Sequence, residues 1–252
     1  MKNLNEYFGS NIKQKNIVIT GGTTGIGKAT AELLISLGAR VLIFGRDQED
    51  FDATFEEITA KYPDAALFGA PADVTNEEDI KMIFDIVDLE MGGIDILINN
   101  AGLPAQGITD SANDEWKYVI DTNIKGYIDF AQQAVSRMKS QKSGHIVNVG
   151  SMSAETQSGE STIYVTTKLA IRGFTSSLRK EINPLEIKVS LIEPGAVMSD
   201  MQPGTKEEQR EKIEKLEMLE ADDLAMSILF VLSQPKRCDI VTMQVRPLLQ
   251  II

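Results

Sequence analysis

The sequence predicts an α/β fold in which a single doubly wound parallel sheet of about seven strands carries helices on both faces. Short apolar runs recur along the chain and are nearly continuous rather than alternating, as expected for parallel strands covered on both faces. Helical patterns lie between these runs, and such alternation is typical of this class. Because no change of composition divides the 252 residues, we expect one domain over 1–252.

The predicted strands are short apolar runs at 16–20, 40–44, 95–99, 145–149, 188–192 and 239–245, and a weaker one lies at 65–73. The helical patterns are amphipathic and lie at 25–37, 47–61, 76–90, 111–140, 162–183 and 221–233. The fourth of these is long enough for two helices. Residues 1–14 precede the first strand and are predicted to be an N-terminal extension.

The segment 202–220 is highly charged and begins at a Pro-Gly break. Its charge pattern indicates a helix with a solvated outer face. Because it follows a strand end, we also expect the stretch 198–220 to form a lid over a substrate pocket.

Composition excludes several classes of partner. The formal net charge is −12, which argues against nucleic acid and against anionic membrane surfaces. Cys238 is the only cysteine, so no internal disulfide can form and a reducing compartment fits. The N-terminus has no apolar signal region and no apolar run approaches the ~20 residues of a membrane span, so we expect a cytoplasmic protein. His145 is the only histidine and is expected to be a satisfied strand residue, so we expect no metal site.

A glycine-rich turn links the first predicted strand to the first predicted helix. It contains Gly21, Gly25 and Gly27. Glycines at this point allow a tight reversal and let backbone amides approach a phosphate at the helix N-terminus. The spacing is Gly-x-x-x-Gly-x-Gly, which differs from the commoner G-x-G-x-x-G pattern.

The residues that end the second strand bear on the choice of cofactor. Gly45 is followed by Arg46 and Asp47, whereas many NAD-binding proteins place an acid at the strand end. An arginine suits a 2′-phosphate, so NADP (NADPH) is favoured over NAD. Asp47 fits two roles equally, as a ligand of the ribose hydroxyls or as a helix N-cap.

Tyr164 precedes Lys168 by four residues in a predicted helix, so the two side chains share one face. A free tyrosine has a pKa of about 10. A cation about 4 Å away, at an effective dielectric constant of about 20, contributes roughly 4 kcal/mol, or about three pKa units. We therefore expect Lys168 to lower the pKa of Tyr164 toward a range suited to proton transfer. Taken alone, the same spacing also fits a packed tyrosine beside a solvated lysine.

Taken together, the motifs make the chain resemble a short-chain dehydrogenase/reductase over about residues 13–246. They stand in the order of that family: TGGTTGIG (20–27), Asp73 with Val74, NNAG (99–102), Asn123 within DTNIKG, Ser151 thirteen residues before Tyr164, and PGAVMSDM (194–201) with Ser199 in place of the family's threonine. The resemblance implies a Rossmann-type fold and hydride transfer between a nicotinamide cofactor and a carbonyl or secondary alcohol.

The resemblance also implies roles for single residues. Tyr164 would be the acid/base, Lys168 would hold the nicotinamide ribose, and Ser151 would bind the substrate oxygen, a role that Ser153 could share. Asn123 would support a water that continues the proton path, although a helix cap is the alternative. The implied cofactor contacts are Gly21, Thr23, Thr24, Gly25, Ile26, Gly27, Arg46, Asp73, Val74, Asn100, Ala101, Gly102, Tyr164, Lys168, Pro194, Gly195, Val197 and Ser199. Val74 and Ala101 fit ordinary packing equally well.

In this family three loops form the substrate pocket, and here they would be 103–108, 152–160 and 195–205. They contain no Arg or Lys, so we expect a neutral small molecule rather than a carboxylate. Lys206 or Arg210 on the lid could still supply a partner for a carboxylate, and this would overturn the expectation of a neutral substrate. The C-terminus is similar to that of NADP-dependent 3-hydroxy acid/serine dehydrogenase-like members, whose substrate we do not transfer.

Members of the family usually self-associate, so we expect a homodimer or homotetramer formed through helices at 122–140 and 164–182. The alternative function is a non-catalytic NADP-binding regulatory protein on the same fold. Such a protein would be expected to lack Ser151, Tyr164 or Lys168, and all three are present.

Overall fold

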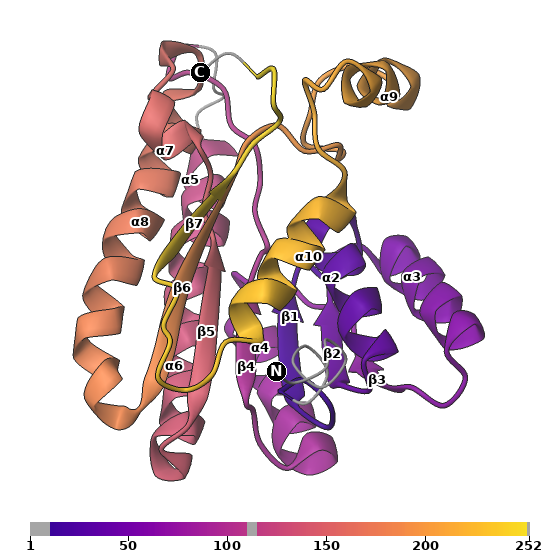
Figure 1. Cartoon of the computed structure of the whole chain (residues 1–252), viewed down its shortest axis with the longest axis vertical. Helices are drawn as coiled ribbons and strands as arrows, with labels where there is room; N and C mark the ends of the chain where they lie inside the picture. Colours follow the sequence, from indigo (N-terminus) through magenta and orange to yellow (C-terminus); the bar gives the residue numbers. More distant parts are fainter. Residues whose placement is uncertain (1–10, 110–114, 251–252) are drawn as a thin grey trace, which may run out of the picture.

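The computed structural model describes residues 11–109 and 115–250. Its seven strands form one parallel sheet in the order β3-β2-β1-β4-β5-β6-β7 (Figure 1). The strands are β1 Asn16–Thr20, β2 Arg40–Phe44, β3 Ala66–Gly69, β4 Ile96–Asn99, β5 Gly144–Val149, β6 Ile187–Pro194 and β7 Thr242–Val245. The predicted fold class, a doubly wound Rossmann-type sheet, is confirmed.

The strand order reverses at β1, and this reversal positions the functional site. Ile19 of β1 lies between Ile43 of β2 and Ile98 of β4 in parallel register. The connections from β1 and β4 therefore leave in opposite directions, which opens a crevice at the carboxyl ends of these strands. The glycine turn that follows β1 and the NNAG segment that ends β4 both lie there.

Helices cover both faces of the sheet, each over its own apolar core (Figure 1). The face packed by the first core holds α2 Gly25–Ser36, α3 Gln48–Lys61 and α10 Ala221–Leu232. The opposite face holds α4 Glu77–Ile86, α6 Gly126–Gln141 and α8 Thr162–Ile182. Strands β1, β2 and β4 are almost wholly buried, which explains why their sequences read as continuous apolar runs.

Two predicted elements differ in detail. The stretch predicted to hold two helices forms one helical run over its described part, in which α5 Glu115–Ile120 passes through a π-turn, η2 Asp121–Lys125, into α6. Residues 111–114 of that stretch lie outside the described part. The last strand is shorter than predicted, because β7 is an edge strand that pairs only with β6 from Thr242 onward.

Short helices lie at the carboxyl end of the sheet. They are α7 Ser153–Thr156 after β5 and α9 Lys206–Glu214 after β6. Figure 1 shows α9 standing away from the sheet, at the end where α7 also lies. The charged segment therefore does form a helix, and its Gln209 is only 4% exposed although nearly all its other side chains face solvent.

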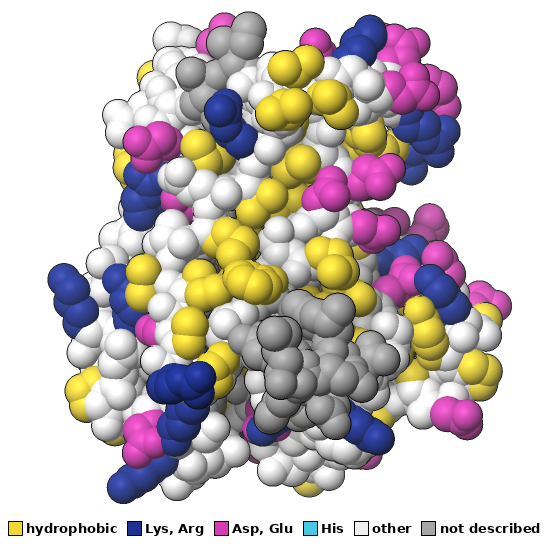
Figure 2. All heavy atoms as spheres, viewed as in Figure 1, with side chains coloured by type: hydrophobic (Ala, Val, Ile, Leu, Met, Phe, Trp, Pro, Cys, Tyr) yellow, Lys and Arg dark blue, Asp and Glu magenta, His cyan; other side chains and the backbone are white. Residues whose placement is uncertain are grey.

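Apolar side chains also reach the surface. Figure 2 shows hydrophobic side chains gathered along the face that carries β7 and α10, and Met226 and Phe230 of α10 are among the exposed ones. On the opposite face of the sheet, Ile128 of α6 and Leu169 of α8 are also exposed. None of the helices in the described ranges is long and apolar enough to cross a bilayer.

Candidate active site

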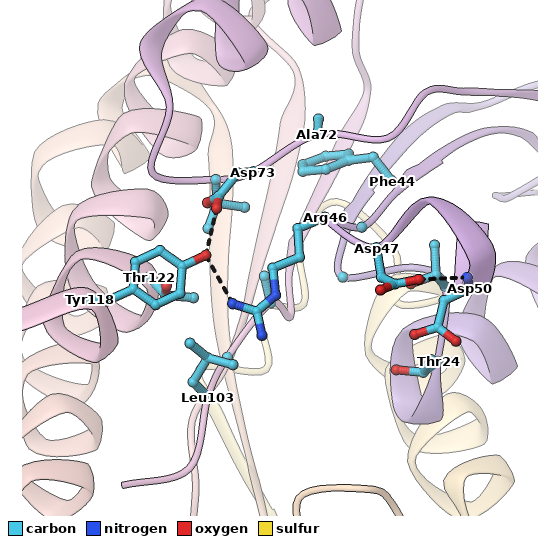
Figure 3. Close-up of a pocket in the computed structure, with 16 residues that line it drawn as sticks. Thr24, Phe44, Arg46, Asp47, Asp50, Ala72, Asp73, Leu103, Tyr118 and Thr122 are labelled. Atoms are coloured by element: carbon cyan, nitrogen blue, oxygen red, sulfur yellow. Dashed lines mark hydrogen bonds between the residues drawn. The ribbon is translucent and has the colours of Figure 1, made fainter. Parts of the chain in front are cut away.

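Two cavities open side by side at the carboxyl end of the sheet and share residues of the glycine turn and of the NNAG segment. We call the first the Arg46 cavity, because Arg46 reaches across it (Figure 3). We call the second the Tyr164 cavity; it also holds Ser151 and Lys168. The shared lining residues are Gly21, Thr24, Ala101 and Gly102. One continuous cleft therefore runs from the end of β2 to the start of α8.

The glycine turn leaves room for a ligand where the two cavities meet. Gly21 has φ +61°, and a Cβ on it would lie 2.9 Å from the Cα of Ala101. A Cβ on Gly27 would lie 2.1 Å from the carbonyl oxygen of Gly21, so no larger residue fits there. By contrast, Gly25 has φ +51° and its open side faces only Ser199, at 3.8 Å. Gly21 and Gly27 thus allow close packing of the backbone, and Gly25 keeps its backbone open to the cleft.

The N-terminus of α2 is left ready for an anion. Its N-cap, Thr24, makes no side-chain capping bond, and its first turn holds no acidic residue. The helices α3, α4 and α9 differ, because a side chain caps each N-terminus and acids occupy each first turn. The first backbone N–H groups of α2 therefore remain available, and the helix dipole favours negative charge beside them.

Asn100 fixes the glycine turn against the end of β4. Its side-chain amide donates to the carbonyl oxygens of Thr20 (3.1 Å) and Gly21 (2.9 Å). In return, the hydroxyl of Thr20 accepts from the backbone N–H groups of Asn100 and Ala101, both at 2.9 Å. Asn100 thus holds the turn in shape.

The Arg46 cavity contains a chain of three polar side chains (Figure 3). The guanidinium of Arg46 donates from Nη1 to the hydroxyl of Tyr118 at 3.1 Å and lies 5.5 Å from the centre of the Tyr118 ring. The Tyr118 hydroxyl in turn donates to Oδ2 of Asp73. The other oxygen of Asp73 accepts from the backbone and hydroxyl of Thr75, both at 2.8 Å. The cavity therefore holds an ordered guanidinium beside a carboxylate whose two oxygens are both occupied.

These contacts set the charges in the cavity. The hydrogen bond to Tyr118 raises the pKa of Arg46, so it remains a cation. Burial alone would raise the pKa of Asp73, but hydrogen bonds from Tyr118 and Thr75 outweigh it and the pKa falls below its usual value. Burial and the Asp73 carboxylate raise the pKa of Tyr118, which therefore remains a neutral phenol.

Sequence reasoning missed several residues of the Arg46 cavity, among them Tyr118 and Thr122. The hydroxyl of Thr122 is buried and has no hydrogen-bond partner within the described parts of the chain. A buried polar atom without a partner costs stability unless a ligand or water satisfies it. No local pattern points to either residue, because both come from α5 and the π-turn, far along the chain from β2.

The Tyr164 cavity brings together Ser151, which follows β5, and Tyr164 and Lys168 of α8. Lys168 is 4% exposed, and its ammonium donates to the carbonyl oxygen of Val149 at 3.2 Å and lies 5.5 Å from the centre of the Tyr164 ring. Ser151 lies close enough to Tyr164 to affect its pKa. Its Oγ also accepts from the backbone of Ser153 at 3.0 Å, which is how Ser153 takes part. The three predicted residues therefore lie in one site.

The pKa values here differ from the expectation. Burial raises the pKa of Tyr164, and Ser151 offsets this only in part. The expectation that Lys168 brings the pKa of Tyr164 below its ordinary value is therefore wrong. The reason is that burial of the phenol dominates, while the Lys168 ammonium is bonded to the Val149 carbonyl rather than to the phenol. Burial also lowers the pKa of Lys168 itself, to about 8.

Asn123 lies in the π-turn η2 and is fully buried. Its Oδ1 accepts from the backbone N–H of Leu103 at 2.8 Å, and its amide donates to the Leu103 carbonyl at 2.9 Å and to Thr167 at 3.2 Å. Asn123 therefore ties the loop after β4 to α8. Asn123 does not act as a helix cap, because its side-chain hydrogen bonds go to Leu103 and Thr167 in other elements.

The segment after β6 completes the cleft. Pro194, Gly195, Val197 and Ser199 line the Tyr164 cavity, as does Ile26 of the glycine turn. The backbone N–H of Ser199 donates to the buried side chain of Gln209 at 3.1 Å, which fastens α9 to this segment. Near the C-terminus, Gln250 accepts from the backbone of Ala196 at 3.1 Å. Distant parts of the chain thus fix the segment from two sides.

The remaining predicted residues are placed as follows. Thr23 and Val74 line the Arg46 cavity, and Val74 is also part of the core, so its position is compatible with both of its predicted uses. The Asp47 carboxylate accepts from the backbone N–H of Asp50 at 3.0 Å, which is the N-cap role. His145 is buried in β5 and hydrogen-bonded to Ser190 at 2.8 Å. Within the described ranges no group of three or more His, Cys, Asp or Glu could hold a metal ion.

Comparison with known proteins shows which family the chain belongs to. The family model described as short chain dehydrogenase matches residues 15–210. Uncharacterized oxidoreductases of Staphylococcus aureus (strain USA300) and Staphylococcus epidermidis are 36% and 32% identical over 237 residues, which cover 94% of this chain and 98% of each relative.

Among solved structures, a metagenomic short-chain oxidoreductase in complex with NADP has a TM-score of 0.80 at 27% identity, covering 95% of this chain and all of the other. Serine dehydrogenase from Escherichia coli has a TM-score of 0.77 at 26% identity, covering 91% of this chain and 96% of the other. The chain therefore belongs to the short-chain dehydrogenase/reductase family and is an oxidoreductase.

Proposed function

We propose that this oxidoreductase uses NADP(H) to interconvert a carbonyl and a secondary alcohol on a neutral small molecule, with Tyr164 as the acid/base. One observation carries the proposal. A single cleft joins an open glycine turn, an arginine that faces its own cavity, and the trio of Ser151, Tyr164 and Lys168. A family member that only binds nucleotide would have no need of all three.

The residues of the cleft fit a dinucleotide. Its pyrophosphate would lie at the N-terminus of α2 beside Gly25, where backbone N–H groups are available and no side chain covers the glycine. The adenosine half would occupy the Arg46 cavity and use the unpartnered hydroxyl of Thr122 or the edge of Asp73. The nicotinamide half would lie in the Tyr164 cavity, against Pro194, Gly195 and Ser199. When bound, such a cofactor supplies hydride transfer to or from the substrate carbon.

The chain's own residues would handle the proton. Ser151 would orient the substrate oxygen through its hydroxyl, next to the Tyr164 phenol whose pKa it affects. Because the pKa of Tyr164 is raised, its phenol is protonated at neutral pH and can donate to a carbonyl oxygen. In the alcohol direction, the Lys168 ammonium would stabilise the phenolate that forms, and its remaining N–H groups would hold the ribose. Asn123 would act by holding the loop at Leu103 and α8 in register.

NADP is the proposed cofactor because Arg46 lies where a ribose phosphate would be. No carboxylate among the described residues forms an ion pair with Arg46, so its charge is available. Arginine recognises phosphate through paired N–H donors. Asp47, the residue that could favour NAD, is already engaged as an N-cap. The related metagenomic enzyme is known in complex with NADP, which agrees with this choice.

A neutral substrate is proposed from the charge of the Tyr164 cavity. Its only basic lining residue is Lys168, and Asp200 lies on its rim. Arg172 is close in sequence but is bonded to Glu193 at 2.8 Å and 3.0 Å and to Glu155 at 2.9 Å. With the remaining N–H groups of Lys168 assigned to the ribose, a substrate carboxylate would find no further cationic partner in the lining. We further propose that 198–220 acts as the lid, that the chain is a cytoplasmic homodimer or homotetramer, and that its exposed apolar helix faces serve this association.

The test is oxidation of NADPH and of NADH, followed at the nicotinamide absorbance, with a panel of neutral ketones, aldehydes, diketones and keto acids. The reverse reaction is assayed with alcohols, serine and 3-hydroxy acids. We expect turnover with NADPH on neutral carbonyls and its loss in Tyr164→Phe. Preference for hydroxy or keto acids would overturn the substrate proposal and leave the mechanism intact. Tight NADPH binding without turnover on the panel in either protein would favour a regulatory role.

A further inference from the structure

Tyr118 stands between two opposite charges that would otherwise meet. Its hydroxyl accepts from Arg46 on one side and donates to Asp73 on the other (Figure 3). Arg46 and Asp73 interact through space but form no direct ion pair. The phenol therefore acts as a spacer with one hydrogen bond to each partner.

The contact with Tyr118 also restricts the Arg46 side chain. Arg46 is exposed, and a free arginine at such a position samples many rotamers. Here one N–H is bound to the Tyr118 hydroxyl and the guanidinium lies 5.5 Å from the ring centre. The Nε and Nη2 groups, which make no bond to any described residue, remain to receive an anion in the cavity. Ordering the guanidinium before binding reduces the entropy lost when a phosphate is bound.

The contact with Asp73 keeps a carboxylate from competing. Asp73 lines the same cavity, and its charge would repel a phosphate or capture the guanidinium. Thr75 binds one of its oxygens twice, and Tyr118 binds the other. Without the phenol, Oδ2 would be free to pair with Arg46 directly, and the cation would be neutralised before any ligand arrived.

We propose that Tyr118 is a positioning residue for cofactor choice, which holds Arg46 apart from Asp73 and oriented toward the 2′-phosphate of NADP(H). The inference rests on the proposed function, since it assumes that the Arg46 cavity receives the adenosine half of a nicotinamide dinucleotide. It adds a residue that lies on α5, some seventy positions from Arg46 in the sequence. Tyr118 acts through Arg46 and makes no contact with the reacting groups.

Dissociation constants for NADPH and NADH are measured by fluorescence titration for the wild type, Tyr118→Phe, Arg46→Gln and the double variant. Steady-state kinetics follow with varied cofactor concentration. Tyr118→Phe keeps the ring and removes only the hydroxyl. We expect its Kd for NADPH to rise about 10-fold, and its Kd for NADH to change by less than about 2-fold. Its KM for NADPH should rise in parallel with the Kd, whereas its KM for NADH should not.

The double variant tests whether Tyr118 works through Arg46. In the Arg46→Gln background, Tyr118→Phe should have no further effect on the Kd for NADPH. Tyr62→Phe, at the end of α3 and outside both cavities, is the matched control and should bind both cofactors as the wild type does.

Three results would overturn the inference and leave the proposed function standing. They are an unchanged NADPH affinity in Tyr118→Phe while Arg46→Gln weakens it, an equal loss for NADPH and NADH, and a loss that persists in the Arg46→Gln background. A wild type that does not prefer NADPH would instead overturn the proposed cofactor, and this inference with it. The wild-type titration therefore separates failure of the two proposals.

Discussion

Lys168 at the carboxyl end of the sheet and Lys188 at its amino end are both buried enough for desolvation to lower their pKa values. Their hydrogen bonds differ. Lys188 donates to the carbonyl oxygens of Gln234, Pro235 and Cys238, so its ammonium has as many acceptors as it has N–H groups. Lys168 donates to a single protein acceptor among the described residues, the Val149 carbonyl, and faces a cavity.

The same contrast holds for other groups at the two ends. His145 at the amino end of β5 is buried, with a pKa lowered by burial to about 3, and it is bonded to Ser190. At the carboxyl end, Thr122 is buried and its hydroxyl has no hydrogen-bond partner among the described residues, and the Thr24 side chain does not cap α2. A shifted pKa therefore does not by itself identify a functional group in this molecule. We expect hydrogen-bonding capacity left open toward a cavity to identify such a group, and the predictions below test that distinction.

The largest effect is expected at Tyr164. Replacing Tyr164 by Phe removes the hydroxyl that we propose as the acid/base, and general acid–base catalysis contributes about 10²–10⁴-fold. We expect kcat to fall about 10³-fold, while the Kd for NADPH stays within about 3-fold. Single-turnover rates and cofactor titration measure the two quantities. A fall of less than about 10-fold would show that proton transfer does not depend on this phenol.

The two lysines provide a matched pair. Lys168→Met should lower kcat by about 100-fold or more. It should also raise the free energy of unfolding by about 1–3 kcal/mol, because the buried ammonium is costly and each pKa unit corresponds to about 1.4 kcal/mol. Lys188→Met should leave kcat unchanged and lower the free energy of unfolding by about 1–3 kcal/mol, because three carbonyls lose their donor.

Activity assays and urea unfolding of both variants measure these opposite signs. If Lys188→Met lost activity, or if Lys168→Met were the less stable of the two, the distinction between the ends of the sheet would fail.

The smallest effect concerns the amino end and pH. His145 has a folded pKa of about 3, below the ordinary value of 6.5, so only the unfolded chain takes up this proton as pH falls below 6.5. Stability is therefore present above pH 6.5 and is lost as pH falls toward 3. Linkage gives a loss of about 2 kcal/mol between pH 7.5 and pH 5, a window in which unperturbed carboxylates remain ionised.

His145→Gln should remove about this difference, because it can bond Ser190 without titrating. Urea unfolding of wild type and variant at pH 7.5 and pH 5 measures it, and the chain has no other histidine to confuse the result. An equal pH dependence in the two proteins would mean that His145 is not buried in its neutral form.

Much of the fold could be predicted because its signals are local. The apolar runs of β1, β2 and β4 reflect burial on both faces, and the Gly21–Gly27 turn reflects steric limits that only glycine meets. The turns within the helices could not be predicted in the same way. The π-turn at Asn123 has the composition of an ordinary helix, and it is stabilised by bonds to Leu103 and Thr167 from other parts of the chain.

By itself, the sequence determined the fold class, the family motifs and which side chains are candidates for the chemistry, because these depend on residue type and short spacing. The tertiary structure decided their environment. Tyr164 and Lys168 were recognisable from one helical turn, yet the direction of both pKa shifts follows from burial, which is a property of the assembled core. Tyr118 carries no local signal at all. Its place between Arg46 and Asp73 exists only because the end of β2, the loop after β3 and α5 meet at one corner of the sheet.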